Sequence, residues 1–150
     1  QFQGRFGGRV GLWHSRLAAG ERARVWRGAR DGTIHLVLGP RSAVFAPLAR
    51  LGVIVVDEEH ESAYRQDQKP MYDAVEAALW RGRRHGAVVI LGSATPSLAR
   101  YREASEGRLA LVRMPSRVDG RALPAVRLVN LTQEPLVRRG RTLLTGALRD

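Results

Sequence analysis

The chain has 150 residues, of which 44% are hydrophobic and 26% charged, a composition typical of one globular domain. It has no cysteine, which excludes disulfides and thiolate metal sites, and no apolar run of the roughly 20 residues that a membrane-spanning helix needs. The net charge of +11 favours a nucleic-acid partner, although only Lys69 among the 25 basic residues is a lysine, a bias that genomic base composition also produces.

Short aliphatic runs, most of them continuous, predict strands buried on both faces of a parallel sheet. In chain order these runs are RVGLW (9–13), IHLVLG (34–39), GVIVVD (52–57), AVVILG (87–92), LALV (109–112) and VRLVN (126–130). The first ten residues lack the apolar core of a secretory signal, so we expect a cytoplasmic protein.

Helical patterns alternate with these runs, over residues 20–32, 73–86 and 97–107. Gly32, Gly86 and Gly107 are the expected stops, and Ser97 is the expected start of the third helix. The side chains expected on the buried stripes are Ala23, Trp26 and Ala29 in the first helix, and Ala74, Ala77, Ala78 and Arg81 in the second.

This alternation predicts an α/β fold with a doubly wound parallel sheet. The tail from Met114 is rich in proline, glycine and arginine. It is predicted to form a loop, one strand and a linker before a short helix that starts at Leu143.

Polar segments follow three of the predicted strands, and ligands bind beyond the carboxyl ends of parallel strands. These segments are Gly39–Pro40–Arg41–Ser42, Asp57–Glu58–Glu59–His60 and Gly92–Ser93–Ala94–Thr95–Pro96–Ser97. If the strands are neighbours, all three segments face one crevice.

The acids after the third strand need a compensating cation, because carboxylates about 4 Å apart near a protein surface repel by about 4 kcal/mol. Asp57 is placed to ligate Mg²⁺, and Glu58 to activate a water for phosphoryl transfer. The competing interpretation is a solvated turn whose acids only cap the next helix.

The other two segments have plainer interpretations as well. Serine and threonine before Pro96 often only open a helix, with Ser97 as its N-cap. Arg41 is placed to pair with a phosphate, or is one of many surface arginines. The charge is uneven: residues 1–50 carry nine arginines against two acids, whereas residues 51–100 carry seven acids against six basic side chains.

DEEH (57–60) followed by GSATPS (92–97) resembles motifs II and III of superfamily 2 helicases. The surrounding text, LWHSRLAAGERARVWRGARDG, GPRSAVFAPLARLGVIVVDEEHESAYRQ, GSATPSLARY and GRALPAVRLVNL, resembles the PriA family of bacterial replication-restart helicases. The resemblance covers nearly the whole chain and is most specific around residues 39–66 and 89–98.

The resemblance implies a RecA-like, P-loop NTPase type of parallel sheet with helices on both faces, incomplete at the N-terminus. It implies that Asp57 binds Mg²⁺, that Glu58 activates water, and that His60 with the loop Ser93, Ala94 and Thr95 links nucleotide state to DNA. The DNA-binding residues that it implies are Arg41, Ser42, Tyr64, Arg65 and Tyr72.

By the same resemblance, residues 1–113 form part of helicase lobe 1, with motifs Ib, II and III, and residues 114–150 lead toward the second lobe. The implied activity is ATP-dependent 3′-to-5′ DNA unwinding in primosome assembly and fork restart. ATP and Mg²⁺ are the implied cofactors, and forked or single-stranded DNA, primosome proteins and single-strand-binding proteins the implied partners. The family also binds zinc, for which this chain has no ligands.

Some positions depart from the family pattern. The phosphate-binding sequence G-x-x-x-x-G-K-[ST], upstream in the family, is absent from these residues, so the chain alone is expected to be inactive. Pro40 replaces a threonine and Arg16 a glycine. The family's Tyr-His-Ala-Arg-Asp run is YDAVE here, so that Asp73 and Val75 replace a histidine and an arginine.

Two further functions therefore stay open beside the helicase. One is an ATPase-deficient, fork-binding scaffold for primosome loading, which the altered segment at Asp73 and Val75 favours. The other is a metal-dependent nuclease built on the acids, although further carboxylates at other strand ends are lacking. The intact acids Asp57 and Glu58 favour the helicase, because a scaffold gains nothing from clustered, repelling carboxylates.

Overall fold

The structure is a computed structural model that describes residues 2–116, 136–139 and 142–145. The chain divides into two compact units, Gln1–Leu111 and Val112–Asp150. In the second unit, β7 (Leu136–Arg139) pairs in antiparallel fashion with β8 (Thr142–Thr145).

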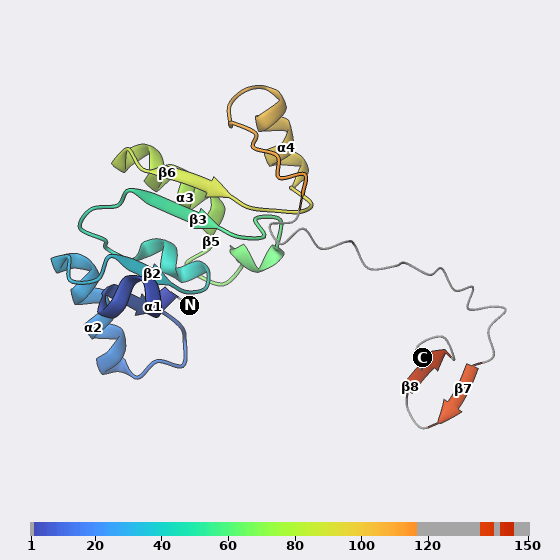
Figure 1. Ribbon diagram of the computed structural model, residues 1–150, viewed down its shortest axis with the longest axis horizontal. Coiled ribbons are helices and arrows are strands. Elements are labelled where there is room, and N and C mark those ends of the chain that lie inside the picture. Colours follow the sequence, from blue (N-terminus) through green and yellow to red (C-terminus); the bar gives the residue numbers. More distant parts are fainter. Residues whose placement is uncertain (1, 117–135, 140–141, 146–150) are drawn as a thin grey trace. The chain divides into compact units, whose positions relative to one another are not determined.

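The first unit alternates helices and strands along the chain (Figure 1). Its elements are α1 (Phe2–Phe6), the 3₁₀ turn η1 (Gly7–Arg9), β1 (Val10–Leu12), α2 (Ala19–Asp31), β2 (Leu36–Leu38), η2 (Arg41–Phe45), β3 (Val53–Val56), η3 (Ser62–Tyr64), β4 (Arg65–Gln66), β5 (Tyr72–Asp73), α3 (Ala74–His85), β6 (Val88–Leu91) and α4 (Leu98–Ser105).

Two pairs of strands are parallel. β1 pairs with β2, and β3 pairs with β6 in a register that places Val56 opposite Leu91. β4 and β5 form a short antiparallel pair. The α/β class and the parallel pairing of the aliphatic runs are therefore confirmed, whereas one RecA-like sheet stays a prediction, because β2 and β3 are not hydrogen-bonded to each other.

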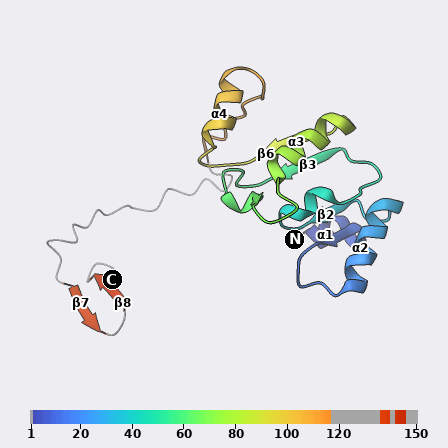
Figure 2. The same cartoon turned by 180° about the vertical axis from the view of Figure 1, so that it is seen from behind.

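The core of the first unit lies between α3 and one face of the β3–β6 pair. Val56 forms a cluster with Val75, Ala78 and Leu79 of α3, each at most 9% exposed. Seen from the two sides in Figures 1 and 2, α3 covers only this face. The opposite face is exposed, and its aliphatic side chains are Val53, Val55, Val88 and Ile90. The predicted burial of both faces is therefore wrong for this pair, because α3 covers only one of them.

The helix ends follow the local signals in the sequence. The side chain of Asp73 caps α3 by accepting hydrogen bonds from the backbone amides of Val75 and Glu76. Gly32 and Gly86 adopt left-handed conformations directly after α2 and α3, where a side chain would be strained. All three predicted helices are confirmed, and α4 ends at Ser105, just before the predicted stop.

Other predictions from the sequence are wrong. LALV (109–112) forms no strand, because no other strand in the described residues pairs with it. The predicted helix from Leu143 is strand β8, which pairs with β7 where a linker was expected. In α2 the buried residues are Val25, Gly28 and Ala29, and Trp26 instead packs on Trp13 with ring centroids 5.5 Å apart. VRLVN (126–130) lies outside the described residues.

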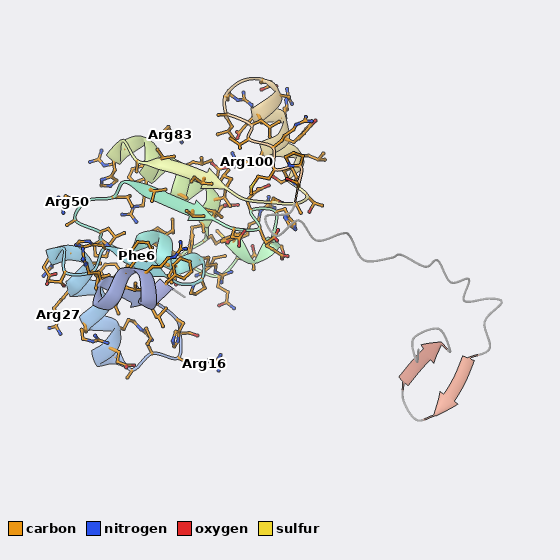
Figure 3. The ribbon with its side chains drawn as sticks, in the orientation of Figure 1. Phe6, Arg16, Arg27, Arg50, Arg83 and Arg100 are labelled. Atoms are coloured by element: carbon orange, nitrogen blue, oxygen red, sulfur yellow. The ribbon has the colours of Figure 1, made fainter. Side chains whose placement is uncertain are left out.

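The charged surface of the first unit is dispersed. Figure 3 shows Arg16, Arg27, Arg50 and Arg83 projecting from separate segments, and all four are exposed. Within residues 2–116, 136–139 and 142–145, every helix is too short or too polar to cross a lipid bilayer.

Candidate functional site

The loops that follow β3 and β6 meet at one edge of their parallel pair. We call Asp57–His60 the acidic strand end and Gly92–Ser97 the hydroxyl segment. Nδ1 of His60 lies 2.7 Å from Oγ of Ser93, and Nε2 lies 3.4 Å from Oγ1 of Thr95. The structure thus brings together His60, Ser93 and Thr95, as predicted, with Ala94 exposed between the two hydroxyls.

Glu58 has an unusual backbone conformation. Its φ of 50° is left-handed, and it is the one non-glycine residue in the described part of the chain with positive φ. Such a conformation costs about 1–2 kcal/mol for a residue with a β-carbon and concentrates at functional sites. The backbone amide of Glu58 donates to Oδ1 of Asp57 at 3.1 Å, and Oε2 of Glu58 lies 3.6 Å from Nδ1 of His60. Both carboxylates are exposed, and that of Glu58 lies beside the histidine.

Arg41 reaches the loop after β3 from the β1–β2 pair. It begins η2, just after β2, and its Nη1 donates to the backbone carbonyls of Ala63 at 2.9 Å and Arg65 at 2.7 Å. The neighbouring Ser42 accepts a hydrogen bond from the indole of Trp13 at 3.1 Å. Arg41 thus joins the end of β2 to the loop after β3, and Ser42 joins η2 to the end of β1.

A half-buried arginine of α3 holds the other end of η2. The guanidinium of Arg81 donates to the carbonyls of Val44 and Ala46. Burial lowers the pKa of Arg81. Arg81, predicted as part of the apolar stripe of α3, is therefore a polar link between this helix and η2.

The aromatic residues predicted to contact DNA lie close to the core. Tyr64 packs against the α3 core, and its hydroxyl donates to the backbone carbonyl of Asp57 at 2.6 Å. Tyr72 is half-buried with its ring edge-on to Phe45, at a centroid distance of 4.9 Å. Arg65 is exposed, and its Nε lies 3.4 Å from Oδ2 of Asp73. The DNA-binding roles of these residues stay predictions.

A pocket of the first unit lies elsewhere. It has a volume of about 280 Å³, is partly open to solvent, and is lined mainly by β1 and α2, including Gly11, Glu21 and Val25. In the described residues, no three histidine or acidic side chains are grouped as a metal site. The acidic strand end presents two exposed carboxylates, Asp57 and Glu58.

Comparison with known proteins decides the family. No family model matches the chain. It is 45% identical over 134 residues to the replication restart protein PriA of Bacillus subtilis (strain 168), covering 89% of this chain and 17% of that protein. It is 42% identical over 134 residues to PriA of Chlamydia pneumoniae, covering 89% of this chain and 18% of the relative. For PriA of Synechocystis sp. the identity is 39% over 153 residues, or 99% of this chain and 18% of the relative. The chain belongs to the PriA family. It spans less than a fifth of the length of these relatives.

The resemblance to PriA identified residues in the loops after β3 and β6, but it did not predict two features of the structure. One is the hydrogen bond from the hydroxyl of Tyr64 to Asp57. The other is the burial of Glu59, which is 6% exposed and bonded to Ser97. The alternation of exposed and buried residues after a strand offers a weak signal for Glu59, whereas no local pattern predicts the Tyr64 contact.

The structure also gives local roles to two of the residues that depart from the PriA pattern, Asp73 and Val75. Asp73 caps α3 and pairs with Arg65 across β4 and β5. Val75 is 5% exposed in the core beside Val56. Both substitutions are therefore compatible with the fold of this segment.

Replacing Tyr64 with phenylalanine is expected to destabilise the chain by about 0.5–1.5 kcal/mol, because it removes the hydrogen bond to Asp57. Burial, followed by the nearby charges of Asp57 and Glu58, raises the pKa of Tyr64 above its ordinary value of 10.0. Because the pKa of Tyr64 is raised in the folded state, its contribution to the free energy of unfolding is fully present below about pH 10. This contribution is lost as the pH rises through the folded-state pKa. Urea unfolding at pH 7 and at pH 11 measures both effects.

The matched control is Tyr101→Phe. Tyr101 is 51% exposed, and its hydroxyl has no hydrogen-bond partner among the described residues. We expect the Tyr101 variant to keep the stability of the parent and the Tyr64 variant to lose less stability at pH 11 than the parent does. Equal stabilities for the two variants at pH 7 would contradict the contact with Asp57.

Proposed function

We propose that the full-length protein is an ATP-dependent 3′-to-5′ DNA helicase of replication restart, and that this chain supplies part of its first, RecA-like lobe. Membership of the PriA family supports the role in restart, because the relatives carry that name. The observation that supports the chemistry is the pairing of His60 with Ser93 and Thr95 beside two exposed carboxylates.

The donor set at the acidic strand end fits Mg²⁺ held together with a nucleotide. Magnesium in such sites takes one or two carboxylates and completes its shell with waters and phosphate oxygens. Asp57 supplies an exposed carboxylate, of which Oδ1 accepts from the Glu58 amide. The bound ion would neutralise charge on the phosphates. In this proposal Asp57 holds the ion and Glu58 orients and deprotonates the attacking water.

His60 is the proposed connection between this chemistry and DNA. Its Nδ1 lies 3.6 Å from Oε2 of Glu58 and 2.7 Å from Oγ of Ser93, and its Nε2 lies 3.4 Å from Oγ1 of Thr95. A change in the charge near Glu58 therefore alters the hydrogen bonds that His60 makes to Ser93 and Thr95. The hydroxyl segment leads directly into α4, so a displacement of Ser93 or Thr95 would also displace the start of this helix.

The test uses the full-length protein, because these 150 residues lack a phosphate-binding sequence. Mg²⁺-dependent ATP hydrolysis is measured with and without single-stranded DNA, together with unwinding of a forked duplex. We expect DNA to stimulate hydrolysis and ATP to drive unwinding. Fork binding without hydrolysis would support the ATPase-deficient scaffold instead, which the departures at Asp73 and Val75 favour.

Single-stranded DNA is the proposed ligand of the surface formed by η2 and the neighbouring Tyr64, Arg65 and Tyr72. The proposed setting is the bacterial cytoplasm, and primosome and single-strand-binding proteins are the further proposed partners. Binding should be independent of sequence and sensitive to salt, with each neutralised phosphate contributing about −0.7 to the log–log slope. Arg41→Ala is expected to lower affinity and to flatten this slope by less than one such contribution, because Nη1 of Arg41 already holds two carbonyls. A salt titration of DNA binding by the chain measures both.

Two variants complete this titration. Arg83→Ala changes an exposed arginine in the last turn of α3 and is the matched charge control. Tyr64→Ala should weaken binding with little change of slope, because stacking is worth about 1–3 kcal/mol per base and releases no counterions. If the Arg41 and Tyr64 variants both bind as the parent does, the DNA-binding assignment of these residues is wrong.

A further inference from the structure

Glu59 is a buried carboxylate beside exposed ones. It is 6% exposed, whereas Asp57, Glu58 and Glu61 in the same loop are exposed. Removing a charge from water is unfavourable unless hydrogen bonds replace the lost hydration. No salt bridge to Glu59 occurs within the described part of the chain, so its burial depends on hydrogen bonds.

Both carboxylate oxygens of Glu59 bind one residue at the start of α4. Oε1 accepts from the backbone amide of Ser97 at 2.6 Å, and Oε2 accepts from its hydroxyl at 3.1 Å. Ser97 is also the N-cap of α4, where its Oγ accepts from the amide of Arg100 at 3.4 Å. A negative charge is favourable at this end of a helix, and hydrogen bonds to a charged acceptor are the stronger kind.

The backbone of Glu59 holds the opposite end of the same segment. Its amide donates to the carbonyl of Gly92 at 3.0 Å. Glu59 is therefore bonded to the first and last residues of the hydroxyl segment, and the residues between them include Ser93 and Thr95, the partners of His60.

We propose that Glu59 is a positioning residue, which fixes both ends of the hydroxyl segment so that Ser93 and Thr95 meet His60, and which thereby connects α4 to the acidic strand end. The inference rests on the proposed function for its effect on turnover. Removal of the carboxylate frees the Ser97 end of the segment but leaves Asp57 and Glu58 in place. DNA-stimulated hydrolysis should then fall by about tenfold, while hydrolysis without DNA and the KM for ATP stay within about twofold.

The experiment compares Glu59→Ala, Glu59→Gln and the exposed control Glu61→Gln in the full-length protein. The first measurement is ATP hydrolysis with and without saturating single-stranded DNA, and the second is amide hydrogen exchange over residues 92–100. Glutamine keeps an acceptor for the Ser97 amide, so we expect Glu59→Gln to retain more DNA stimulation than Glu59→Ala. Exchange at Ser97 and Arg100 should accelerate in the alanine variant and stay at the parent's rate in Glu61→Gln.

The two measurements separate this inference from the proposed function. Unchanged exchange in Glu59→Ala and Glu59→Gln would overturn the positioning role, as would equal losses of hydrolysis with and without DNA. A parent protein without hydrolysis would refute the proposed function, and the exchange rates would then still decide whether Glu59 holds the segment. If the alanine variant does not fold, the ratio of stimulated to unstimulated rates in Glu59→Gln decides alone.

Discussion

Replacing Glu58 with glutamine in the full-length protein is expected to lower ATP turnover by about 10²–10⁴-fold while nucleotide still binds. Glutamine keeps the size and hydrogen bonding of the side chain but cannot accept the proton of the attacking water. Glu58 is exposed beside Asp57 at the end of β3, so the substitution removes no buried contact. Single-turnover hydrolysis and equilibrium binding of a fluorescent ATP analogue measure the two quantities.

Glu61→Gln is the matched control, because it removes an exposed carboxylate from the same loop. It should turn over ATP as the parent does. If Glu58→Gln also hydrolyses ATP at the parent's rate, Glu58 does not activate water, and the helicase interpretation of the acidic strand end fails. Glu58→Gly adds a test of the backbone: since φ is 50°, the glycine variant should be about 1 kcal/mol more stable than Glu58→Ala, and equally inactive.

Replacing Gly39 with alanine is expected to destabilise the chain by about 1–3 kcal/mol. An added β-carbon would lie 2.2 Å from the backbone oxygen of Trp13, which a rotation of a side chain cannot relieve. The amide of Trp13 donates to Leu38 at 2.7 Å, so the clash forces apart the ends of β1 and β2. The midpoint of urea unfolding measures the loss, and the tryptophan fluorescence reports displacement of Trp13.

Gly52→Ala is the control for this substitution. Gly52 is also exposed and outside the helices, but nothing lies within 4 Å of the position of its added β-carbon. We expect its stability to stay within about 0.5 kcal/mol of the parent's. Similar midpoints for the two variants would mean that β1 and β2 do not approach each other at Gly39.

Local patterns in the sequence were sufficient where one segment contains all the interacting groups. The continuous aliphatic runs of β3 and β6 predicted parallel strands. The runs are continuous because both faces of these strands are apolar: one face packs against α3, and the other is exposed. Ser97, Gly32 and Gly86 marked helix ends, because caps bond to amides or carbonyls a few residues away. The tail shows the limit of such patterns: TLLT reads as a helix start alone but pairs with Leu136–Arg139.

The buried stripe of α2 shows a second limit. Periodicity favoured Ala23, Trp26 and Ala29, but the helix packs through Val25, Gly28 and Ala29. Ile34 packs closely against Gly28: a β-carbon added at Gly28 would lie only 2.9 Å from Cδ1 of Ile34. This packing depends on the shape of a neighbouring segment, which the hydrophobicity of α2 itself does not encode.

The sequence by itself determined the candidates for the chemistry: the acids, the histidine and the hydroxyls stand directly after aliphatic runs, and their types suit Mg²⁺ and phosphate. Only the tertiary structure decided which of them touch. The bonds from His60 to Ser93 and Thr95, and from Ser97 to Glu59, join residues 33, 35 and 38 positions apart. They form because the register of β3 against β6 sets Val56 opposite Leu91, so that the two loops leave the sheet side by side.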